Sequence, residues 1–294
     1  MDRCNTVVNI QRNNFTWSTS FNISTIRNEV TKLEQDNQVG GLDGIQSYVL
    51  KEGAPLGSYN LIHFEGVDPG EGNSIFTDQN GDGLINADDA VIPRDENGNI
   101  LSAWPDFFGG LTNTFSYKGL SLSAFFQFSV GNYIWNHGRY AQEQVGWSFN
   151  FGGFLLPYGN NTQRVEDGRW RQPGDETDIP RAGTGQLFDE NGNVISGSEY
   201  QNWQEISDQW LEDGSFLRLK NLQLAYNLPG RWFSNSPLKG ATVYFRGQNI
   251  WTLTNYLGVD PEVSSNGESV LYPGEDYGGL GQAKTFVFGA KVQL

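Results

Sequence analysis

Hydrophobic and polar residues alternate along several stretches of the chain with the two-residue period of a β-strand. In LSLSAFFQFSVG, which begins at Leu120, every second residue is apolar and most of the residues between them are polar. The closing AKTFVFGAKVQL, KNLQLAYNL at 220–228 and FTWSTSFNIS at 15–24 repeat this pattern. Because successive side chains of a strand point to opposite faces, each stretch predicts a strand with one apolar and one polar face.

The predicted strands are long, and they cover 4–12, 15–26, 107–117, 120–131, 215–228, 241–254 and 283–294. Strands of soluble domains usually have about 5 or 6 residues, whereas a tilted strand that crosses a bilayer has roughly 9 to 11. The polar faces carry serine, glutamine, asparagine and lysine, which suit a wet barrel lumen. A soluble sheet with one solvated face shows the same alternation, so this pattern alone leaves both structures open.

Short and long connections alternate along the chain. Asn13-Asn14 and Lys118-Gly119 are two-residue links, 229–240 is of moderate length, and the long irregular segments are 28–106, 132–214 and 255–282. Outer-membrane barrels have short periplasmic turns and long extracellular loops. If the short links lie in the periplasm, the strand 283–294 runs from the extracellular side to the periplasmic side. The pattern therefore predicts a periplasmic C-terminus.

The aromatic residues and the strand faces lead to two further predictions for a barrel. Aromatic girdles mark the two membrane interfaces of such proteins. The candidates are Tyr117, Tyr226 and Trp232 at the turn end, and Tyr133, Trp135, Trp251 and Tyr256 at the loop end. In the strands 120–131 and 283–294, we expect lipid contact for Phe126, Phe128, Phe286 and Phe288, and lumen contact for Gln127, Lys291 and Gln293. Seven strands are too few to close a barrel with an open lumen, so the chain is expected to form part of one.

The composition excludes several kinds of function. The 294 residues include 19 Lys and Arg against 34 Asp and Glu, for a net charge of −15, and no basic run is present. Such a chain is a poor nucleic-acid binder, because phosphate contacts need clustered Lys and Arg. Cys4, His63 and His137 are too few and too scattered for a disulfide framework or an ordinary zinc site. No apolar run is long enough for a spanning helix, and no signal peptide precedes the first strand, so we expect either a cytosolic protein or a piece of a longer one.

Catalytic patterns find little support in the sequence. It has no GxSxG motif and no phosphate-binding glycine loop. The acidic pairs Glu166-Asp167 and Asp175-Glu176 are typical of solvated loops rather than of glycosidase carboxylates. The tryptophans at 147, 170, 203 and 210 suit either stacking on sugar rings or packing of the long loop onto itself. We therefore expect no enzymatic activity.

The segment TDQNGDGLINADDA, at 77–90, has the spacing of a calcium-binding loop of twelve residues. In this prediction Ca²⁺ is bound by Asp78, Asn80 and Asp82 at positions 1, 3 and 5, by the Leu84 carbonyl at position 7 and by Asp89 at position 12, where glutamate is usual. Gly83 makes the sharp turn, and Asp88 is expected to face solvent. The alternative is that Asn80-Gly81 and Asp82-Gly83 form tight turns without metal. The DENGN segments at 95–99 and 189–193 lack the full ligand spacing, and we expect hairpin turns there.

Several ordered motifs carry a resemblance to a known family. They are NADDAVIPRDENGNILSAWPDFFGGLTNTFSYKGLSLSAFFQFSVGNYIWN, GSFLRLKNLQLAYNLP, VYFRGQNIWTLTNYLGVDPEV and TFVFGAKVQL. Together they resemble the C-terminal part of the SusC/RagA family of TonB-linked outer-membrane transporters, over about residues 15–294. The resemblance implies an all-β fold: about seven strands of a large antiparallel transmembrane β-barrel with long extracellular loops.

The resemblance also implies a function and partners. Residues 1–294 would be the C-terminal segment of one barrel domain of 22 strands, with the plug domain and the earlier strands absent. The whole protein would import glycan or peptide fragments through the bacterial outer membrane, capped by a SusD-like surface lipoprotein and energised by the TonB complex. The alternative is a secreted, soluble β-sheet module that binds calcium and recognises glycans.

Overall fold

The computed structural model describes residues 2–34, 37–39, 47–143, 148–151, 154–157, 162–182, 186–188, 194–199, 205–234, 236–267 and 269–294. Its main feature is an antiparallel sheet of seven strands in the order β1-β2-β8-β9-β16-β17-β19. These strands are β1 (Asp2–Arg12), β2 (Phe15–Ser24), β8 (Phe107–Tyr117), β9 (Leu120–Val130), β16 (Phe216–Asn227), β17 (Gly240–Thr254) and β19 (Thr285–Gln293). The sequence predicted all seven within a few residues, and the mostly β fold is confirmed.

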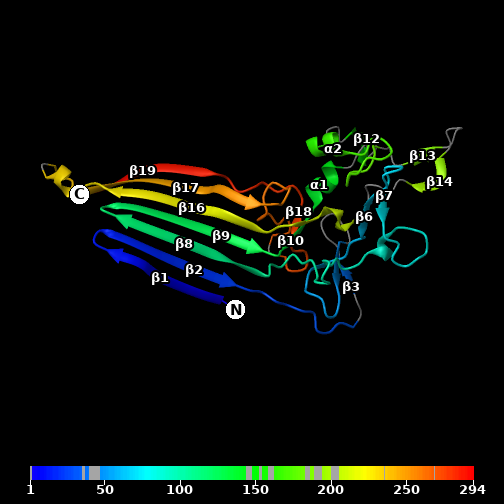
Figure 1. The fold of residues 1–294 in the computed structure, drawn as a ribbon, viewed down its shortest axis with the longest axis horizontal. Coiled ribbons are helices and arrows are strands. Elements are labelled where there is room, and N and C mark those ends of the chain that lie inside the picture. Colours follow the sequence, from blue (N-terminus) through cyan, green and yellow to red (C-terminus); the bar gives the residue numbers. More distant parts are fainter. Residues whose placement is uncertain are drawn as a thin grey trace.

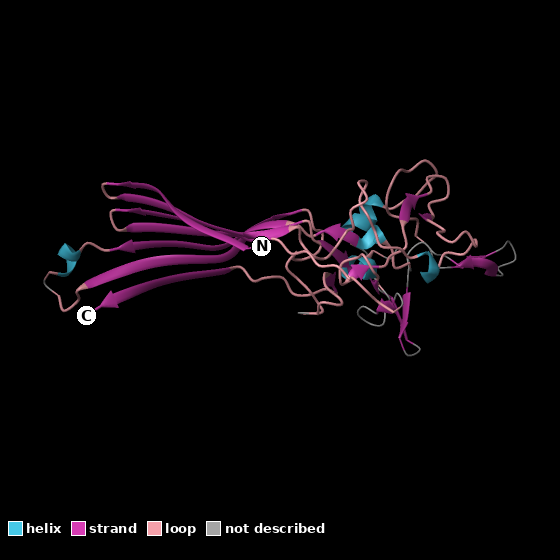
Figure 2. Cartoon of the chain, turned by 90° about the horizontal axis from the view of Figure 1, so that it is seen from below, coloured by secondary structure: helices cyan, strands magenta, loops and turns pink. Residues whose placement is uncertain are grey.

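The sheet forms one twisted layer, with the short connections at one end and the long segments at the other (Figures 1 and 2). We call these the turn end and the loop end. The C-terminus lies at the turn end, as predicted, and β1 begins near the loop end (Figure 1). Every long segment therefore leaves and re-enters the sheet on the same side of the molecule.

The short connections have the backbone that a tight hairpin needs. Lys118 and Gly119 both have positive φ, at 45° and 88°, as in a type I′ turn. Asn13 also has a positive φ, of 50°, which asparagine tolerates better than most residues. The moderate link between β16 and β17 contains a short 3₁₀ helix, η4 (Gly230–Phe233). Asp95–Asn99 is also a turn, as predicted, whereas 189–193 lies outside the described residues.

The long segments have more structure than the prediction of irregular loops allowed. They contain α1 (His137–Gln142), α2 (Gln163–Gly168), η2 (Ala87–Asp89) and η3 (Asp208–Trp210). Their strands are β3 (Asn37–Val39), β4 (Tyr48–Leu50), β5 (Ser58–Tyr59), β6 (Phe64–Val67), β7 (Ser74–Phe76), β10 (Tyr133–Asn136), β11 (Ser148–Phe151), β12 (Phe154–Pro157), β13 (Gln186–Phe188), β14 (Val194–Glu199), β15 (Leu211–Asp213) and β18 (Glu275–Asp276). These strands form small sheets of two or three, such as β15-β10-β18. We call the described parts of 25–106, 131–215 and 255–284 the loop region.

The loop region has its own hydrophobic core, which the sequence did not reveal. Tyr48, Tyr59, Leu61, Trp135 and Trp210 are buried together there. The Tyr48 hydroxyl donates to the Pro273 carbonyl at 2.7 Å, and the Trp135 indole donates to the Ser207 carbonyl at 3.1 Å. Burial raises the pKa of the Tyr48 and Tyr59 hydroxyls. The polar atoms of these large side chains thus have partners, as a buried aromatic core requires.

The core corrects part of the aromatic prediction. Trp135 is fully buried in the loop region and Tyr256 is 5% exposed, so neither belongs to a membrane girdle. Both residues follow a strand end closely, which is why sequence position alone misassigned them. Trp251, by contrast, is exposed on the sheet, and Tyr117 and Trp232 are exposed at the turn end. None of the helices in the described part of the chain is long and apolar enough to cross a membrane.

Candidate functional site

The strand register gives the sheet two chemically different faces. One row of directly paired residues crosses all seven strands, and its members are Ile10, Trp17, Phe115, Leu122, Leu224, Phe245 and Phe288. A row on the opposite face consists of Thr6, Ser20, Thr112, Phe125, Asn221, Gln248 and Thr285. We call these the apolar face and the polar face. Since the strands keep this alternation in register, each face is continuous across the sheet.

The apolar face is exposed although it is made of large side chains. Phe286 and Phe288 are 58% and 78% exposed, and Val243, Trp251 and Leu253 are exposed beside them on β17. Cross-strand ring contacts join Trp17 to Phe115 at 5.6 Å and Phe245 to Phe288 at 4.9 Å. Phe126 and Phe128 lie on this face, and Gln127, Lys291 and Gln293 lie on the other, as predicted. An apolar surface of this extent on a protein marks an interaction site rather than a water-facing wall.

One cluster of polar groups on the apolar face is hydrogen-bonded within the sheet. The Asn113 side-chain carbonyl accepts hydrogen bonds from the Trp17 indole at 3.0 Å and from the Thr19 hydroxyl at 2.7 Å. The Asn9 amide donates in turn to the Thr19 hydroxyl at 2.6 Å. Because these groups are hydrogen-bonded, moving them from water into a non-aqueous environment costs much less free energy than it would for unpaired groups.

Strand β16 contains a bulge that explains its sequence. In FLRLKNLQLAY, the leucines at 217 and 219 are odd-numbered, whereas those at 222 and 224 are even-numbered. The pairing to both neighbouring strands shifts between Leu219 and Asn221. Lys220 is the extra residue against β9, whereas against β17 the extra residue lies on β17, at 249–250. The bulge returns all four leucines to the apolar face. On β17 the irregularity falls at Asn249, which has a positive φ of 52°, so Gly247 and Trp251 still share the apolar face.

A charged cluster anchors the last long segment to the polar face. Arg218 of β16 pairs with Asp260, and its other terminal nitrogen lies 2.7 Å from a Glu262 oxygen. The Lys220 ammonium and the Gln127 amide also donate to Glu262, at 2.9 and 3.1 Å. Arg218 is 2% exposed, so this is a buried network whose charges are matched by neighbours.

The electrostatics of Asp260 follow from that network. Burial alone would raise the pKa of this carboxyl, but hydrogen bonds from Arg218 and from the backbone N–H groups of Gln282 and Glu262 outweigh it. The pKa of Asp260 therefore lies below its ordinary value. These contacts connect both ends of the segment 260–282 to the wall of the sheet, so they position the chain that covers part of the polar face.

The predicted calcium loop is closed by hydrogen bonds of its own. Asp78 accepts from the backbone N–H groups of Gly81 and Gly83 at 2.7 and 2.8 Å, and Asp82 accepts from that of Leu84 at 2.7 Å. Asn80 accepts from the N–H of Asp82 at 2.8 Å. These are the contacts of consecutive Asx turns. The Leu84 side chain is exposed, and the backbone of the segment follows the sharp path that the motif predicts, with positive φ at Gly81 and Gly83.

Asp89 has a structural role in addition to the one predicted for a terminal metal ligand. It is buried, and its two carboxylate oxygens accept from the N–H groups of Gln79, Asn80 and Asn86. The Asn86 contact above all holds the pKa of Asp89 below its ordinary value. Among the described residues, no group of three or more His, Cys, Asp or Glu side chains is placed to hold a metal. Calcium binding by Asp78, Asn80, Asp82, Leu84 and Asp89 stays a prediction. The hydrogen bonds from backbone N–H groups to these carboxylates also stabilise the conformation of the loop.

The other candidate residues mostly have structural contacts. Glu166 pairs with Arg169 at 2.7 Å, and Asp175 accepts from the backbone N–H groups of Arg171 and Gln172. Trp210 is in the loop core, and the Trp170 indole donates to the Pro69 carbonyl, in agreement with the packing interpretation. Trp147 and Trp203 lie outside the described residues. Sequence reasoning missed the Arg218, Asp260 and Glu262 cluster, although two cations close together in one predicted strand pointed to such a cluster.

Comparison with known proteins gives a consistent result. The chain is 30% identical over 315 residues to the TonB-dependent receptor P26 of Formosa agariphila, covering 97% of this chain and 28% of that receptor. It is 26% identical over 294 residues to the TonB-dependent receptor SusC of Bacteroides thetaiotaomicron, covering 95% of this chain and 24% of SusC. No family model matches the chain.

The fold is also found in a solved structure. The chain superposes on the RagAB peptide transporter with a TM-score of 0.66 and 26% identity, covering 99% of this chain and 28% of that one. In all three comparisons, this chain spans about a quarter of the length of the protein it matches. The match includes the sheet and the loop region, since nearly all of this chain is covered.

Proposed function

The chain is homologous to the SusC/RagA-type TonB-dependent receptors, and from this relationship we propose that it forms the C-terminal part of the barrel wall of an outer-membrane importer. The family is one of transporters and is not enzymatic. Since the chain spans about a quarter of its relatives' length, it supplies a share of the wall and of the outer loops.

The observation that carries the proposal is the two-faced sheet. In a barrel wall, the apolar face meets lipid and the polar face meets the water-filled interior. The row from Ile10 to Phe288 is apolar across all seven strands, and the opposite row is polar apart from Phe125. The edges at β1 and β19 would pair with the remaining strands, because a barrel in lipid leaves no strand edge open.

The orientation follows from the two ends of the sheet. The turn end, with the C-terminus, faces the periplasm in this proposal, and the loop region faces the cell exterior (Figure 1). The Arg218 cluster then lies at the upper inner wall, where it holds the segment 260–282 against the pore lining. Exposed Trp251 and Trp232 are at opposite ends of the sheet, and they fit the two membrane interfaces.

Partners and cargo are proposed from the relatives. The matched structure is that of the RagAB peptide transporter, which supports a RagB-like or SusD-like lipoprotein over the loop region. The relatives' names indicate TonB dependence, which the whole protein would have through parts outside this chain. The cargo would be a peptide or glycan fragment.

Thiol accessibility tests the placement of the sheet. Phe286→Cys and Lys291→Cys, made in the full-length protein with Cys4→Ser, place probes on opposite faces of β19. In whole cells we expect a water-soluble maleimide to label Cys at 291 and to spare Cys at 286. A nitroxide-labelled lipid should quench a fluorophore only at 286. Equal labelling and equal quenching at both positions would contradict the proposal.

TonB-dependent uptake tests the activity. Cells that produce the full-length protein should accumulate a fluorescent cargo oligomer, and deletion of TonB should abolish this accumulation. A protein that inserts correctly but gives the same uptake with and without TonB would contradict an energised importer while leaving the barrel placement intact.

A further inference from the structure

A groove opens on the apolar face at the loop end of the sheet, where β8, β9, β16 and β17 meet the loop region. Its volume is about 490 Å³, within the usual range of roughly 300–1,000 Å³ for ligand sites. The side chains of its apolar wall all belong to the apolar face, and they are Phe107, Phe128, Val130, Leu217 and Leu253. In the proposed orientation, the groove lies at the outer end of the lipid-facing wall.

Two features of the sequence hollow out this part of the sheet. Phe128 leans away from β16, because the tip of its ring lies over Gly109 of β8, where a Cβ atom would come within 2.9 Å of it. The same ring stacks on Phe21 of β2 at a centroid distance of 6.1 Å. On the other side, Ser215 has a small side chain and precedes Leu217 by two positions. Space therefore remains between Phe128 and Leu217, and it forms the groove.

The end of the groove nearest the loop region is polar, and internal hydrogen bonds fix it. The lining residues at this end are Asp213, Ser215, Thr254 and Asn255. The Ser215 hydroxyl accepts from the Gly131 N–H at 2.9 Å, and the Asp213 carboxylate accepts from the Ser215 N–H at 2.8 Å. The Thr254 hydroxyl donates to the Ser215 carbonyl at 2.8 Å. This end of the groove is thus preorganised.

The polar end also carries negative charge. Asp213 is exposed there, and no lysine, arginine or histidine of the described residues lines the groove. Tyr133 pairs with Asp213, and burial, followed by the charge of nearby carboxylates with Asp213 first among them, raises the pKa of the Tyr133 hydroxyl. A carboxylate attracts an ammonium and repels a phosphate, so the charge at this end favours a ligand with an ammonium group.

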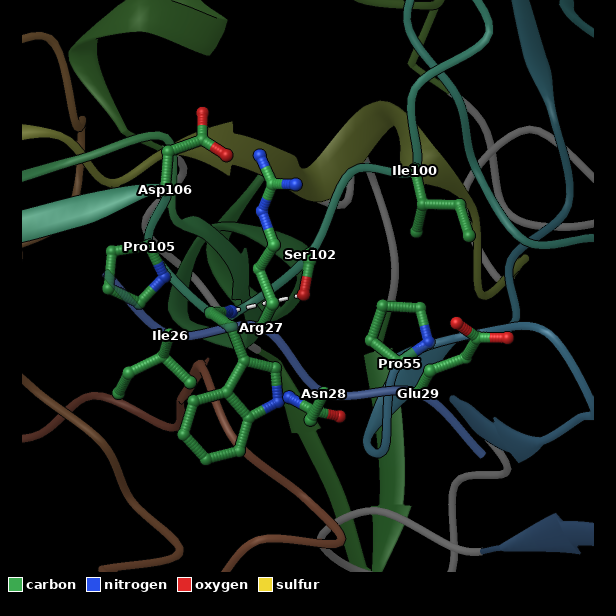
Figure 3. Close-up of a pocket in the computed structure, with 10 residues that line it drawn as sticks. Ile26, Arg27, Asn28, Glu29, Pro55, Ile100, Ser102, Pro105 and Asp106 are labelled. Carbon is green, nitrogen blue, oxygen red and sulfur yellow. Dashed lines mark hydrogen bonds between the residues drawn. The ribbon is translucent and has the colours of Figure 1, made fainter. Parts of the chain in front are cut away.

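The pocket at the loop end of β2 and β8 has a different character. It lies between residues 26–29 and 100–106, and Arg27, Glu29 and Asp106 are among its lining residues (Figure 3). All three are exposed, and the carboxylates of Glu29 and Asp106 lie on opposite sides of the pocket (Figure 3). Charges of both signs on the wall suit a hollow filled with water. The groove between Phe128 and Leu217 has an apolar wall instead, which suits a hydrocarbon chain.

The groove has the orientation that a lipid of the outer leaflet needs. Its apolar wall lies on the membrane side of its polar end, so a chain in it would run from the interface toward the bilayer centre. Trp251, which is exposed on the same face two residues before Leu253, fits the outer interface at this level. The groove is also continuous with the rest of the lipid-facing wall.

We propose that the groove between Phe128 and Leu217 holds an acyl chain of an outer-leaflet phospholipid whose ammonium headgroup lies against Asp213. The inference rests on the proposed barrel placement. It assigns one bound lipid to a defined site on a wall that otherwise meets exchanging lipid.

Native mass spectrometry of the full-length transporter with its partner lipoprotein tests the site. The complex is delipidated in detergent and then given phosphatidylethanolamine or phosphatidylglycerol. We expect the wild type to retain one phosphatidylethanolamine and to prefer it to phosphatidylglycerol by about two- to fivefold, the effect of an exposed ion pair. Asp213→Asn should remove this preference and leave the acyl chain bound, because an asparagine oxygen still accepts from the Ser215 N–H.

Larger side chains in the groove test the acyl chain itself. Leu217→Trp and Leu253→Trp each fill part of the groove and should abolish lipid retention. Leu253 is 60% exposed, so its replacement leaves folding intact even where Leu217→Trp disturbs it. Leu224→Trp is the matched control, because Leu224 is an exposed leucine on the same face of β16 outside the groove. It should retain lipid as the wild type does.

Three results would overturn the inference: no lipid on the wild type, equal retention by both groove variants, or a preference for phosphatidylglycerol. A lipid-free dimer that both groove variants dissociate would also overturn it, and would assign the groove to a second copy of the protein. Thiol labelling that spares Cys at 286, combined with any of these results, would show that the lipid site is wrong while the barrel placement is correct.

Discussion

The sheet and the loop region differ in whether their large apolar side chains are buried. In the loop region, Tyr48, Trp135 and Trp210 are buried against one another. In the sheet, side chains of the same size, such as Phe286 and Trp251, are exposed, and among its described residues Phe216 alone is a buried hydrophobic. The loop region is therefore built like a soluble domain, and the sheet is built for surroundings that the chain does not itself provide.

This difference shows where each region obtains its stability. Burial of an aromatic side chain in the loop core contributes on the order of 1.5–3 kcal/mol through removal of apolar area from water. The apolar face of the sheet gains this only when lipid or another apolar surface covers it. The soluble glycan-binding alternative would need a protein surface over the whole apolar face, and the loop region lies at one end of the sheet instead (Figure 2).

The largest expected effect is in the loop core. Trp135→Ala removes a fully buried ring and should destabilise the loop region by about 3–5 kcal/mol. Hydrogen exchange on the detergent-solubilised full-length protein should show faster exchange in the loop region and unchanged protection in the sheet. Trp232→Ala, at a position 61% exposed, is the control and should change little. Loss of protection throughout the sheet would show that the two regions are not separate in stability.

The next effect distinguishes the faces of the sheet. Ala124 and Ser123 are neighbours of similar size on β9, with Ala124 on the apolar face and Ser123 on the polar face. Ala124→Arg should cost about 2–4 kcal/mol near the middle of a lipid-facing strand. Ser123→Arg should destabilise the protein much less, because the new charge faces the water-filled interior of the barrel. Urea unfolding in liposomes measures both variants, and equal costs would mean that the apolar face does not contact lipid.

A smaller effect is expected from pH in the loop region. Burial, and then the neighbouring Asp89 carboxylate, raises the pKa of Glu205 to about 7. Between about pH 4.5 and 7 the unfolded chain has lost this proton while the folded chain keeps it, so stability falls as pH rises through that range. Glu205→Gln should flatten this part of the profile, and Glu96→Gln, at an exposed turn, should leave it unchanged. Thermal unfolding of the loop region at pH 5 and pH 7 gives the comparison.

The smallest effect concerns the loop 78–89, whose order has two explanations. If calcium is bound, calorimetry on the full-length protein should give one site, Asp78→Ala should abolish it, and Asp88→Ala should leave it. Asp88 is exposed, which agrees with the prediction that it faces solvent. No heat of binding in millimolar calcium would leave the amide hydrogen bonds of Asp78 and Asp89 as the full explanation.

The strands were predictable because their determinants are local. Alternation with period two and the dipeptide Lys118-Gly119 are both contained in a few consecutive residues, and they placed β8 and β9 to within a residue. The phase change around Lys220 was also visible in the sequence, since the even and odd leucines meet there. The amphipathic faces then followed from the register.

The loop core and the pocket were not predictable because their residues come together from distant segments. Tyr48, Trp135 and Trp210 show no shared periodicity, and Arg27 lines a pocket with Asp106, which is far away in the sequence. The Arg218 and Asp260 pair joins residues 42 positions apart. The calcium motif was readable from spacing, but the use of Asp89 as an acceptor for three backbone amides depends on burial that spacing does not encode.

The hydrogen bond from Tyr48 to Pro273 joins residues 225 positions apart, and this separation has a consequence for folding order. Hairpins such as β8-β9 close through two residues and can form early, whereas contacts between distant residues form slowly because a large loop must close first. The core of the loop region therefore cannot be complete until the segment before β19, which contains Pro273, has reached the loop end of the sheet. Resistance of the Tyr48 segment to protease should appear late in assembly, and its appearance would time the arrival of the last long segment.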